Sequence, residues 1–123
     1  MTYQIKVLKI SQKESFDDLM KFKPLRVVAS RSHQNSKMAS FLAKFSSIDL
    51  LRMGSSLKFM SIVDQEADIY PRFSPCMEWD TAASDAILRC LGYQIRSISD
   101  SFEVGSQLIY NKENLYNSAF IAY

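Results

Sequence analysis

The chain has 123 residues, of which 47% are hydrophobic and 12% aromatic, which is enough apolar material for one packed domain. Its net charge of +2 divides unevenly, because residues 1–58 hold eleven Lys/Arg against four Asp/Glu, and residues 59–123 hold four against nine. The lysines of the basic half are scattered, so a solvated surface is favoured over a nucleic-acid patch. The composition therefore predicts one globular domain, 1–123, without nucleic acid as a partner.

The cysteines and the hydropathy pattern bear on the compartment. Cys76 and Cys90 form no Cys-x-x-Cys motif or Cys/His cluster, so zinc binding is not predicted and both are expected to be reduced thiols. No basic and then apolar leader opens the sequence, and no apolar run approaches the roughly 20 residues of a spanning helix. We therefore expect a cytoplasmic protein without a transmembrane segment.

Apolar residues nearly alternate over residues 3–10, which predicts a half-buried strand, and residues 11–23 are predicted to be a polar connection. The β-branched run at 25–29 predicts a central strand. It leads into Ser30-Arg-Ser-His33. Active groups often lie at such strand ends in α/β sheets, so this segment is a candidate part of a site.

A helix is predicted after a cap at Asn35 or Ser36. Four residues at helical spacing form its predicted buried face: Met38, Phe41, Leu42 and Phe45. Residues 48–53 predict another strand, and Gly54 permits a turn before a second short helix, which Ser55 or Ser56 can cap. Three residues of that helix are expected to face the core: Leu57, Met60 and either Ile62 or Val63.

The clearest predicted helix spans residues 79–91, with Gly92 where a left-handed C-cap belongs. Its predicted buried stripe has five members: Trp79, Ala83, Ala86, Ile87 and Cys90. A brief strand at 67–70, ended by Pro71, precedes it. Further strands are predicted near 93–98, 107–110 and 119–122. The alternation predicts a layered α/β domain, in which helices flank a mixed β-sheet.

Three residues are candidates for phosphate or metal chemistry. Asp80 lies in the first turn of the 79–91 helix, where the helix dipole favours a carboxylate that can hold Mg2+; taken alone, such a residue is more often an ordinary N-terminal acid. Lys58 lies in the first turn of the preceding helix, where backbone N–H groups and a lysine can receive phosphate. Arg72 follows Pro71 and can clamp a phosphate, with a structural ion pair as its alternative.

His33 is the only histidine of the chain and directly follows Ser32. A lone histidine more often packs or hydrogen-bonds than acts as a catalytic base. The sequence has no Gly-x-Ser-x-Gly motif and no glycine-rich phosphate loop, and Ser32 has no candidate base beyond its neighbour. Nucleophilic catalysis by a serine is therefore not predicted.

Five segments stand in one order along the chain: Val28-Ala-Ser-Arg-Ser-His33, Gly54-Ser-Ser-Leu-Lys-Phe59, Ala67-Asp-Ile-Tyr-Pro-Arg-Phe73, Met77-Glu-Trp-Asp-Thr-Ala-Ala83 and Tyr110-Asn-Lys-Glu113. Together they resemble the 3'(2'),5'-bisphosphate nucleotidases, a branch of the inositol monophosphatase superfamily. The resemblance runs from about residue 25 to the end. It implies the C-terminal half of the inositol monophosphatase-like fold.

The resemblance implies Mg2+-dependent hydrolysis of adenosine 3',5'-bisphosphate to AMP and phosphate, which clears a by-product of sulfate assimilation. Asp80 would be a metal ligand that also orients the substrate. Five further residues would line the nucleotide and the non-scissile phosphate: Ser32, His33, Ser55, Lys58 and Arg72. Inositol phosphates are the alternative substrates within the family, and the Ser-Arg-Ser-His and Tyr-Pro-Arg segments favour the nucleotide.

In this superfamily most metal ligands come from an N-terminal half, which contributes a helix glutamate and an Asp-Pro-x-Asp-Gly-Thr segment. Neither Asp-Pro nor Asp-Gly occurs among the 123 residues, so Mg2+ is expected to bind weakly and the isolated chain to be inactive. Three interpretations stay open. The chain is an enzyme half with a separately encoded N-terminal partner, a non-catalytic nucleotide-binding or phosphate-binding module, or a truncated remnant that self-associates through an exposed former interface.

Overall fold

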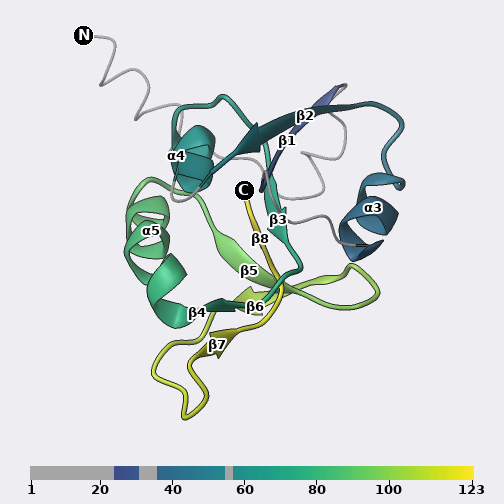
Figure 1. Ribbon diagram of the computed structural model, residues 1–123. Coiled ribbons are helices and arrows are strands. Elements are labelled where there is room, and N and C mark those ends of the chain that lie inside the picture. Colours follow the sequence, from purple (N-terminus) through teal and green to yellow (C-terminus); the bar gives the residue numbers. More distant parts are fainter. Residues whose placement is uncertain (1–23, 31–35, 55–56) are drawn as a thin grey trace, which may run out of the picture.

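The computed structural model describes residues 24–30, 36–54 and 57–123 (Figure 1). The strand predicted at 3–10 and the connection at 11–23 lie outside these ranges. The described elements are β1 (Leu25–Ser30), α3 (Ser36–Leu42), β2 (Ile48–Met53), α4 (Leu57–Val63), β3 (Tyr70–Arg72), β4 (Cys76–Met77), α5 (Glu78–Cys90), β5 (Ile95–Ile98), β6 (Val104–Gln107), β7 (Tyr116–Asn117) and β8 (Phe120–Ala122).

Six of the described strands form a mixed sheet in the middle of the molecule, and β4 and β7 form a separate two-stranded antiparallel sheet. β1 and β2 pair in parallel, and β3, β8, β5 and β6 are antiparallel neighbours in that order. A parallel bridge between Val27 and Ile69 connects the two groups, and the Val28 N–H donates to the Ile69 carbonyl at 3.0 Å. In Figure 1, α4 and α5 lie on one side of these strands and α3 on the other. The predicted layered α/β architecture with a mixed sheet is therefore confirmed.

Neighbouring residues of the same strands supply two separate hydrophobic cores. Val28 and Phe120 belong to the core under α4 and α5, whereas Val27 and Ile121 belong to the core that contains Phe41 of α3. Successive side chains of a strand point to opposite faces of a sheet, so a sheet covered on both faces buries both sets. This explains why Val27, Val28 and Ala29 are apolar in succession and do not alternate with polar residues.

Two strands lie a few residues away from their predicted positions at 67–70 and 107–110. β3 spans Tyr70–Arg72 and contains Pro71, which pairs with Ile121 and does not end the strand. A proline is tolerated there because β3 pairs along its length with β8 alone, so its missing N–H removes no ladder bond on the other side. The strand predicted at 107–110 is found at Val104–Gln107. The two-residue strands β4 and β7 were not predicted, since so short a segment shows no alternation.

The helix predicted at 79–91 is confirmed as α5, and Gly92 has the expected positive φ, 86°. The prediction of its buried face was wrong. The stripe residues Trp79 and Ile87 are 65% and 46% exposed, and its two alanines and Cys90 are exposed as well. The buried residues of the helix are Glu78, Thr81, Asp85 and Leu88. Three of these four are polar, and residues far along the chain satisfy them, which helical periodicity does not reveal.

The two shorter helices also differ in detail from the prediction. In α4 the buried apolar residues are Phe59 and Ile62, while Leu57 is 57% exposed. The Phe59 ring packs edge-on against Tyr70, with 5.0 Å between ring centroids, and this contact sets the rotation of the helix. In α3, Phe41 is buried as predicted, but Phe45 lies beyond the helix end. Across the described ranges, no helix combines the length and the apolarity needed to cross a lipid bilayer.

The inward and outward faces of α5 can be tested by two neighbouring truncations. Leu88 is fully buried, so Leu88→Ala is expected to lower the free energy of unfolding by about 2–5 kcal/mol through lost burial and a residual cavity. Ile87→Ala is expected to cost on the order of 0.5 kcal/mol, because much of that side chain already contacts water. Urea denaturation of both variants measures the difference. Equal losses would contradict the described rotation of α5.

Candidate functional site

Lys58 is the first element of the candidate site. It is the second residue of α4 and only 4% exposed, which is rare for a lysine. Its Nζ lies over the Tyr70 ring, 5.7 Å from the centroid, where the ring face attracts a cation. The ion pairs found within 24–30, 36–54 and 57–123 give Lys58 no carboxylate partner. The side chain is thus held by packing and by an aromatic ring.

Arg72 lies beside Lys58, at the end of β3. Its Nε donates to the Ser74 carbonyl at 3.3 Å and its Nη2 to the Pro75 carbonyl at 3.2 Å, so the loop that follows the strand holds the guanidinium. Burial lowers the pKa of Lys58, and the positive charge of Arg72 lowers it further. Two cations therefore share one neighbourhood, and a bound anion there would relieve their repulsion.

Tyr70 connects the two cations with the start of α5. Burial raises the pKa of its phenol, the Arg72 guanidinium opposes that rise, and the charges of Cys76 and Asp80 add to it. Tyr70 and Arg72 stand two residues apart on β3 and share a face of the strand. The sequence analysis did not select Tyr70. The signal that could have found it was this spacing within the Tyr-Pro-Arg segment.

Asp80 lies exposed in the first turn of α5. Its Oδ2 accepts a hydrogen bond from the Met77 N–H at 2.9 Å, which is the bond of an N-terminal helix cap. The ordinary structural role foreseen for this residue is therefore present. Its Oδ1 accepts no hydrogen bond from the residues that the structure describes, so one carboxylate oxygen stays available to a ligand.

The other two carboxylates of α5 point away from Asp80. Glu78 accepts from the Asn111 N–H at 2.7 Å and forms an ion pair with Lys112. Asp85 is 1% exposed and accepts from the Tyr110 hydroxyl at 2.6 Å. Asp85 is five residues beyond Asp80, and at about 3.6 residues per turn it therefore lies well round the helix from it. In the described part of the chain no three His, Cys, Asp or Glu residues gather in a way that could hold a metal ion.

The donor set around Asp80 does not fit a complete Mg2+ site. Mg2+ prefers several oxygen ligands in near-octahedral geometry, and a single carboxylate leaves most positions to water. Asp80 is that single carboxylate, and the nearby charged groups, Lys58 and Arg72, are cations. These residues suit an anion better than they suit a metal ion.

The structure describes three of the six predicted site residues. Lys58, Arg72 and Asp80 come from α4, β3 and α5 and surround Tyr70, so helices and strands distant in sequence bring them together. The other three lie outside the described residues: Ser32, His33 and Ser55. Their predicted roles stay predictions.

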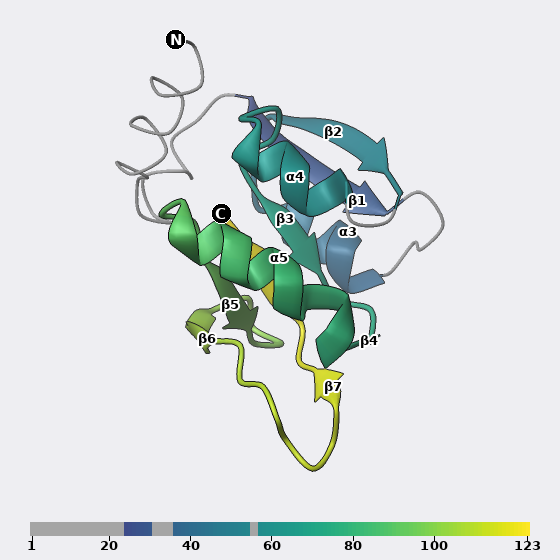
Figure 2. The ribbon, with the colours of Figure 1, turned by 90° about the vertical axis from the view of Figure 1, so that its left-hand side faces the viewer.

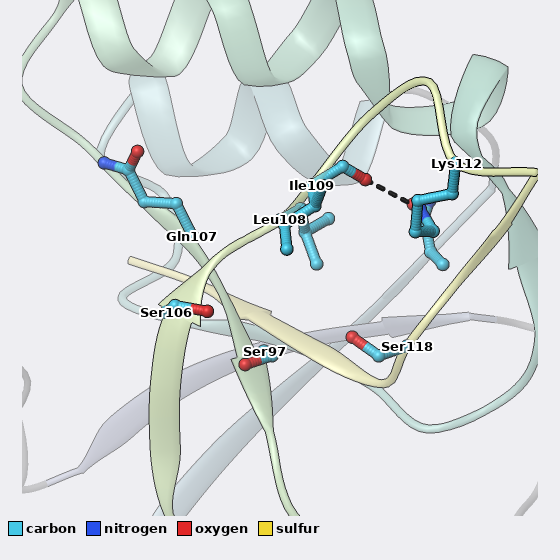
Figure 3. Close-up of a pocket in the computed structure, with 8 residues that line it drawn as sticks. Ser97, Ser106, Gln107, Leu108, Ile109, Lys112 and Ser118 are labelled. Atoms are coloured by element: carbon cyan, nitrogen blue, oxygen red, sulfur yellow. Dashed lines mark hydrogen bonds between the residues drawn. The ribbon is translucent and has the colours of Figure 1, made fainter.

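The described residues line hollows near the β3–β8–β5–β6 strands of the sheet. A cavity of about 20 Å³ beside Arg72 is lined by residues of β1, α3 and the 70–74 segment, too small for a nucleotide. A larger hollow of about 360 Å³ lies between β5, β6 and the 108–118 segment. Ser97, Ser106 and Ser118 line it, and Lys112 donates to the Ile109 carbonyl at 2.6 Å (Figure 3). It contains none of the predicted site residues.

The fold is a layered α/β domain with a mixed sheet, and the chain belongs to the inositol monophosphatase family, whose profile matches residues 1–121. The match extends the resemblance to the start of the chain, beyond the expected limit near residue 25. Within this family, the chain is similar to the 3'(2'),5'-bisphosphate nucleotidases called CysQ. The family resemblance and the fold class predicted from the sequence are thereby confirmed.

Three CysQ proteins give the extent of the similarity. The chain is 36% identical over 99 residues to CysQ of Buchnera aphidicola, covering 78% of this chain and 37% of that protein. It is 38% identical over 73 residues to CysQ of Salmonella typhimurium, covering 59% and 30%. The crystal structure of CysQ from Bacteroides thetaiotaomicron, a bacterial member of the inositol monophosphatase family, matches with a TM-score of 0.71 at 38% identity, covering 82% and 37%. The chain thus spans roughly a third of these relatives.

The ion pair at the start of α5 predicts a pH dependence of stability. The hydrogen bond from Lys112 lowers the pKa of Glu78, and the backbone N–H groups of Asn111 and Lys112 act in the same direction. A carboxyl whose folded pKa is depressed stabilises the fold above its ordinary pKa of about 4.3, and that contribution is lost as the pH falls through the folded pKa. Glu78→Gln is therefore expected to lower the free energy of unfolding at pH 7 and to converge with the wild type below pH 4.

Urea denaturation between pH 3 and pH 7 measures this convergence. Glu113→Gln is the matched control, because Glu113 is exposed and should change stability little at any pH. A Glu78→Gln difference that stays constant across the series would contradict the assignment.

Proposed function

We propose that this chain supplies the nucleotide-binding part of a 3'(2'),5'-bisphosphate nucleotidase and binds adenosine 3',5'-bisphosphate or AMP through Lys58, Arg72 and Asp80. The observation that supports it is the buried Lys58 beside Arg72, neither of which forms an ion pair with a carboxylate of the described ranges. A phosphate dianion offers two negative oxygens to such a pair. The proposal keeps the cytoplasmic location, in line with free thiols at Cys76 and Cys90.

Each of the three residues has a distinct part in the proposal. Arg72, whose Nε and Nη2 each donate to a backbone carbonyl, contacts a phosphate oxygen through further N–H bonds of its guanidinium. Lys58 supplies a compact positive charge. A bound anion raises the pKa of its ammonium group back toward the ordinary value, which offsets the effect of burial and of Arg72. Asp80, with Oδ2 held by Met77, offers Oδ1 to a ribose hydroxyl or to one position of a shared cation. These are binding roles and not bond-breaking ones.

We also propose that the chain alone does not hydrolyse the nucleotide. In this chemistry bound Mg2+ activates water and neutralises the developing charge, and such work needs a cluster of carboxylates. Asp80 is one carboxylate, and Glu78 and Asp85 are committed to Lys112, Arg89 and Tyr110. The remaining ligands must then come from outside this set of residues.

Calorimetric titration with adenosine 3',5'-bisphosphate and with AMP tests the binding proposal. Lys58→Ala and Arg72→Ala should each weaken binding by about 10-fold to 100-fold, because a hydrogen bond to a charged group contributes about 1.5–3 kcal/mol. Arg96→Ala is the control, since Arg96 donates to the Gly105 carbonyl on the β6 side of the sheet. Its affinity should match the wild type. Unchanged binding in both site variants would contradict the proposed site.

The same samples discriminate the alternatives. Nucleotide binding without Mg2+-dependent phosphate release supports a binding module or an enzyme part. The absence of both binding and phosphate release supports a remnant. Tighter binding of inositol phosphates would favour that branch of the family. Mg2+-dependent release of phosphate from adenosine 3',5'-bisphosphate by the chain alone would refute the proposed inactivity.

The exposed apolar stripe of α5 supports a partner chain as part of the same proposal. In Figure 2 this helix faces the viewer, outside the sheet. Trp79 and Ile87 are 65% and 46% exposed, and Ala83, Ala86 and Cys90 extend the surface between and beyond them. An apolar surface of this kind commonly marks an interface. Because Trp79 directly precedes Asp80, a polypeptide packed on the stripe would bring its own side chains to the site.

We expect the occupant to be the part of a CysQ-type protein to which this chain does not align. Mixed with that part of Buchnera aphidicola CysQ, the wild-type chain should form a complex in sedimentation velocity. Ile87→Lys should weaken it by about tenfold or more, because a buried charge without a partner is costly. Ile109→Lys is the control, since Ile109 is 66% exposed and lies outside α5.

Two results would contradict this partner. One is the absence of a complex with the wild-type chain. The other is a dimer of the wild-type chain that Ile87→Lys dissociates, which would show that the stripe of α5 binds a second copy of this chain.

A further inference from the structure

Asn117 of β7 is buried and contacts the start of α5 through one amide group. It is 8% exposed, and its Nδ2 donates to the Met77 carbonyl and to the Thr81 hydroxyl, each at 2.9 Å. The same nitrogen lies 3.4 Å from the Cys76 sulfur. One side chain thus connects β7 with β4 and with the first turn of the helix that carries Asp80.

Met77 links this amide to the candidate site. Its carbonyl accepts from Asn117, and its N–H donates to Asp80 Oδ2 at 2.9 Å. The pairing of β4 with β7 places Met77 opposite Tyr116, and the Glu78 N–H donates to the Leu115 carbonyl at 2.8 Å. The position of Met77, and with it the direction of the Asp80 carboxylate, therefore depends on the segment around Asn117.

The two ends of the Asn117 amide differ in what they contribute. The Asn117 Oδ1 is buried and accepts no hydrogen bond from residues 24–30, 36–54 and 57–123. An unpaired buried acceptor destabilises a fold, and an apolar side chain of similar size would avoid that loss. The two donated hydrogen bonds are what the asparagine supplies, and both end at the start of α5.

We infer that Asn117 is a positioning residue for Asp80: by fixing Met77 it holds Asp80 Oδ2 and leaves Oδ1 to the ligand. This inference rests on the proposed function, in which Asp80 contacts the nucleotide. Asn117 itself touches neither the ligand nor the two cations of the site.

A second group of hydrogen bonds joins Tyr110, in the segment before β7, to α5 without reaching Met77. The Tyr110 hydroxyl donates to Asp85 Oδ2 at 2.6 Å and lies 3.1 Å from the Thr81 hydroxyl. Removing that hydroxyl weakens the contact between the 110–117 segment and α5 but leaves the Asn117 to Met77 bond in place. Tyr110→Phe is therefore a matched control for general loosening of this interface.

The test uses Asn117→Leu, which keeps the size of the side chain and removes its donors. Two readouts are needed: the exchange rate of the Met77 amide proton by NMR, and the affinity for adenosine 3',5'-bisphosphate by calorimetry. The inference expects about tenfold faster exchange and about tenfold weaker binding in Asn117→Leu. Tyr110→Phe should lower the unfolding midpoint while leaving both readouts at wild-type values.

A double-mutant cycle separates positioning from a purely structural effect. If Asn117 acts through Asp80, Asn117→Leu should weaken binding in the wild-type background and cause no further loss in the Asp80→Ala background. An equal loss in both backgrounds, or a Met77 amide that exchanges at the wild-type rate, overturns the inference. If the wild-type chain binds no nucleotide, the proposed function fails. The exchange rate of the Met77 amide proton then tests by itself whether Asn117 fixes Met77.

Asn117→Leu could also prevent folding, and a second variant covers that outcome. Asn117→Asp keeps the shape of the side chain and loses the same donors, so it is expected to speed Met77 amide exchange in the same way. Protection of that amide at the wild-type level in Asn117→Asp overturns the inference.

Discussion

The buried polar face of α5 is the constraint on which the rest of the structure depends. Asp85 is 1% exposed, and it is stable there because Arg89 donates to it at 2.9 Å and Tyr110 at 2.6 Å. A buried carboxylate without such partners would strongly destabilise the fold. The 110–117 segment must therefore lie against this face of the helix. The apolar stripe then has no position left except the outside, where Trp79 and Ile87 are exposed.

This rotation of α5 also forms the candidate site. With Asp85 and Glu78 turned toward the 110–117 segment, Asp80 is the carboxylate that remains on the side of Tyr70 and Arg72. Lys58 reaches the same place from α4 because Phe59 and Tyr70 pack edge-on and rotate that helix. One carboxylate meets two cations, an arrangement suited to an anion with hydroxyl groups. The exposed stripe beside it and the shortage of metal ligands support the same proposal, in which a second polypeptide completes the site.

The family relation agrees with this arrangement. The chain belongs to the inositol monophosphatase family and spans roughly a third of the CysQ proteins that it resembles. Several of the segments that carried the resemblance in the sequence contribute described residues to the site and to the polar face. Tyr70 and Arg72 belong to one of them, and Tyr110 to another, where it hydrogen-bonds to α5.

The sequence by itself determined the elements that local chemistry encodes. The β-branched run predicted β1, the span of α5 followed from helical spacing, and Gly92 ended it because that φ favours glycine. Lys58, Arg72 and Asp80 were predicted as site residues from their charge and their place near element ends. Only the tertiary structure decided which face of α5 is buried, and it alone revealed Tyr70 and Asn117. These features depend on partners that are distant in sequence, such as Tyr110 for Asp85, and periodicity within one helix carries no information about them.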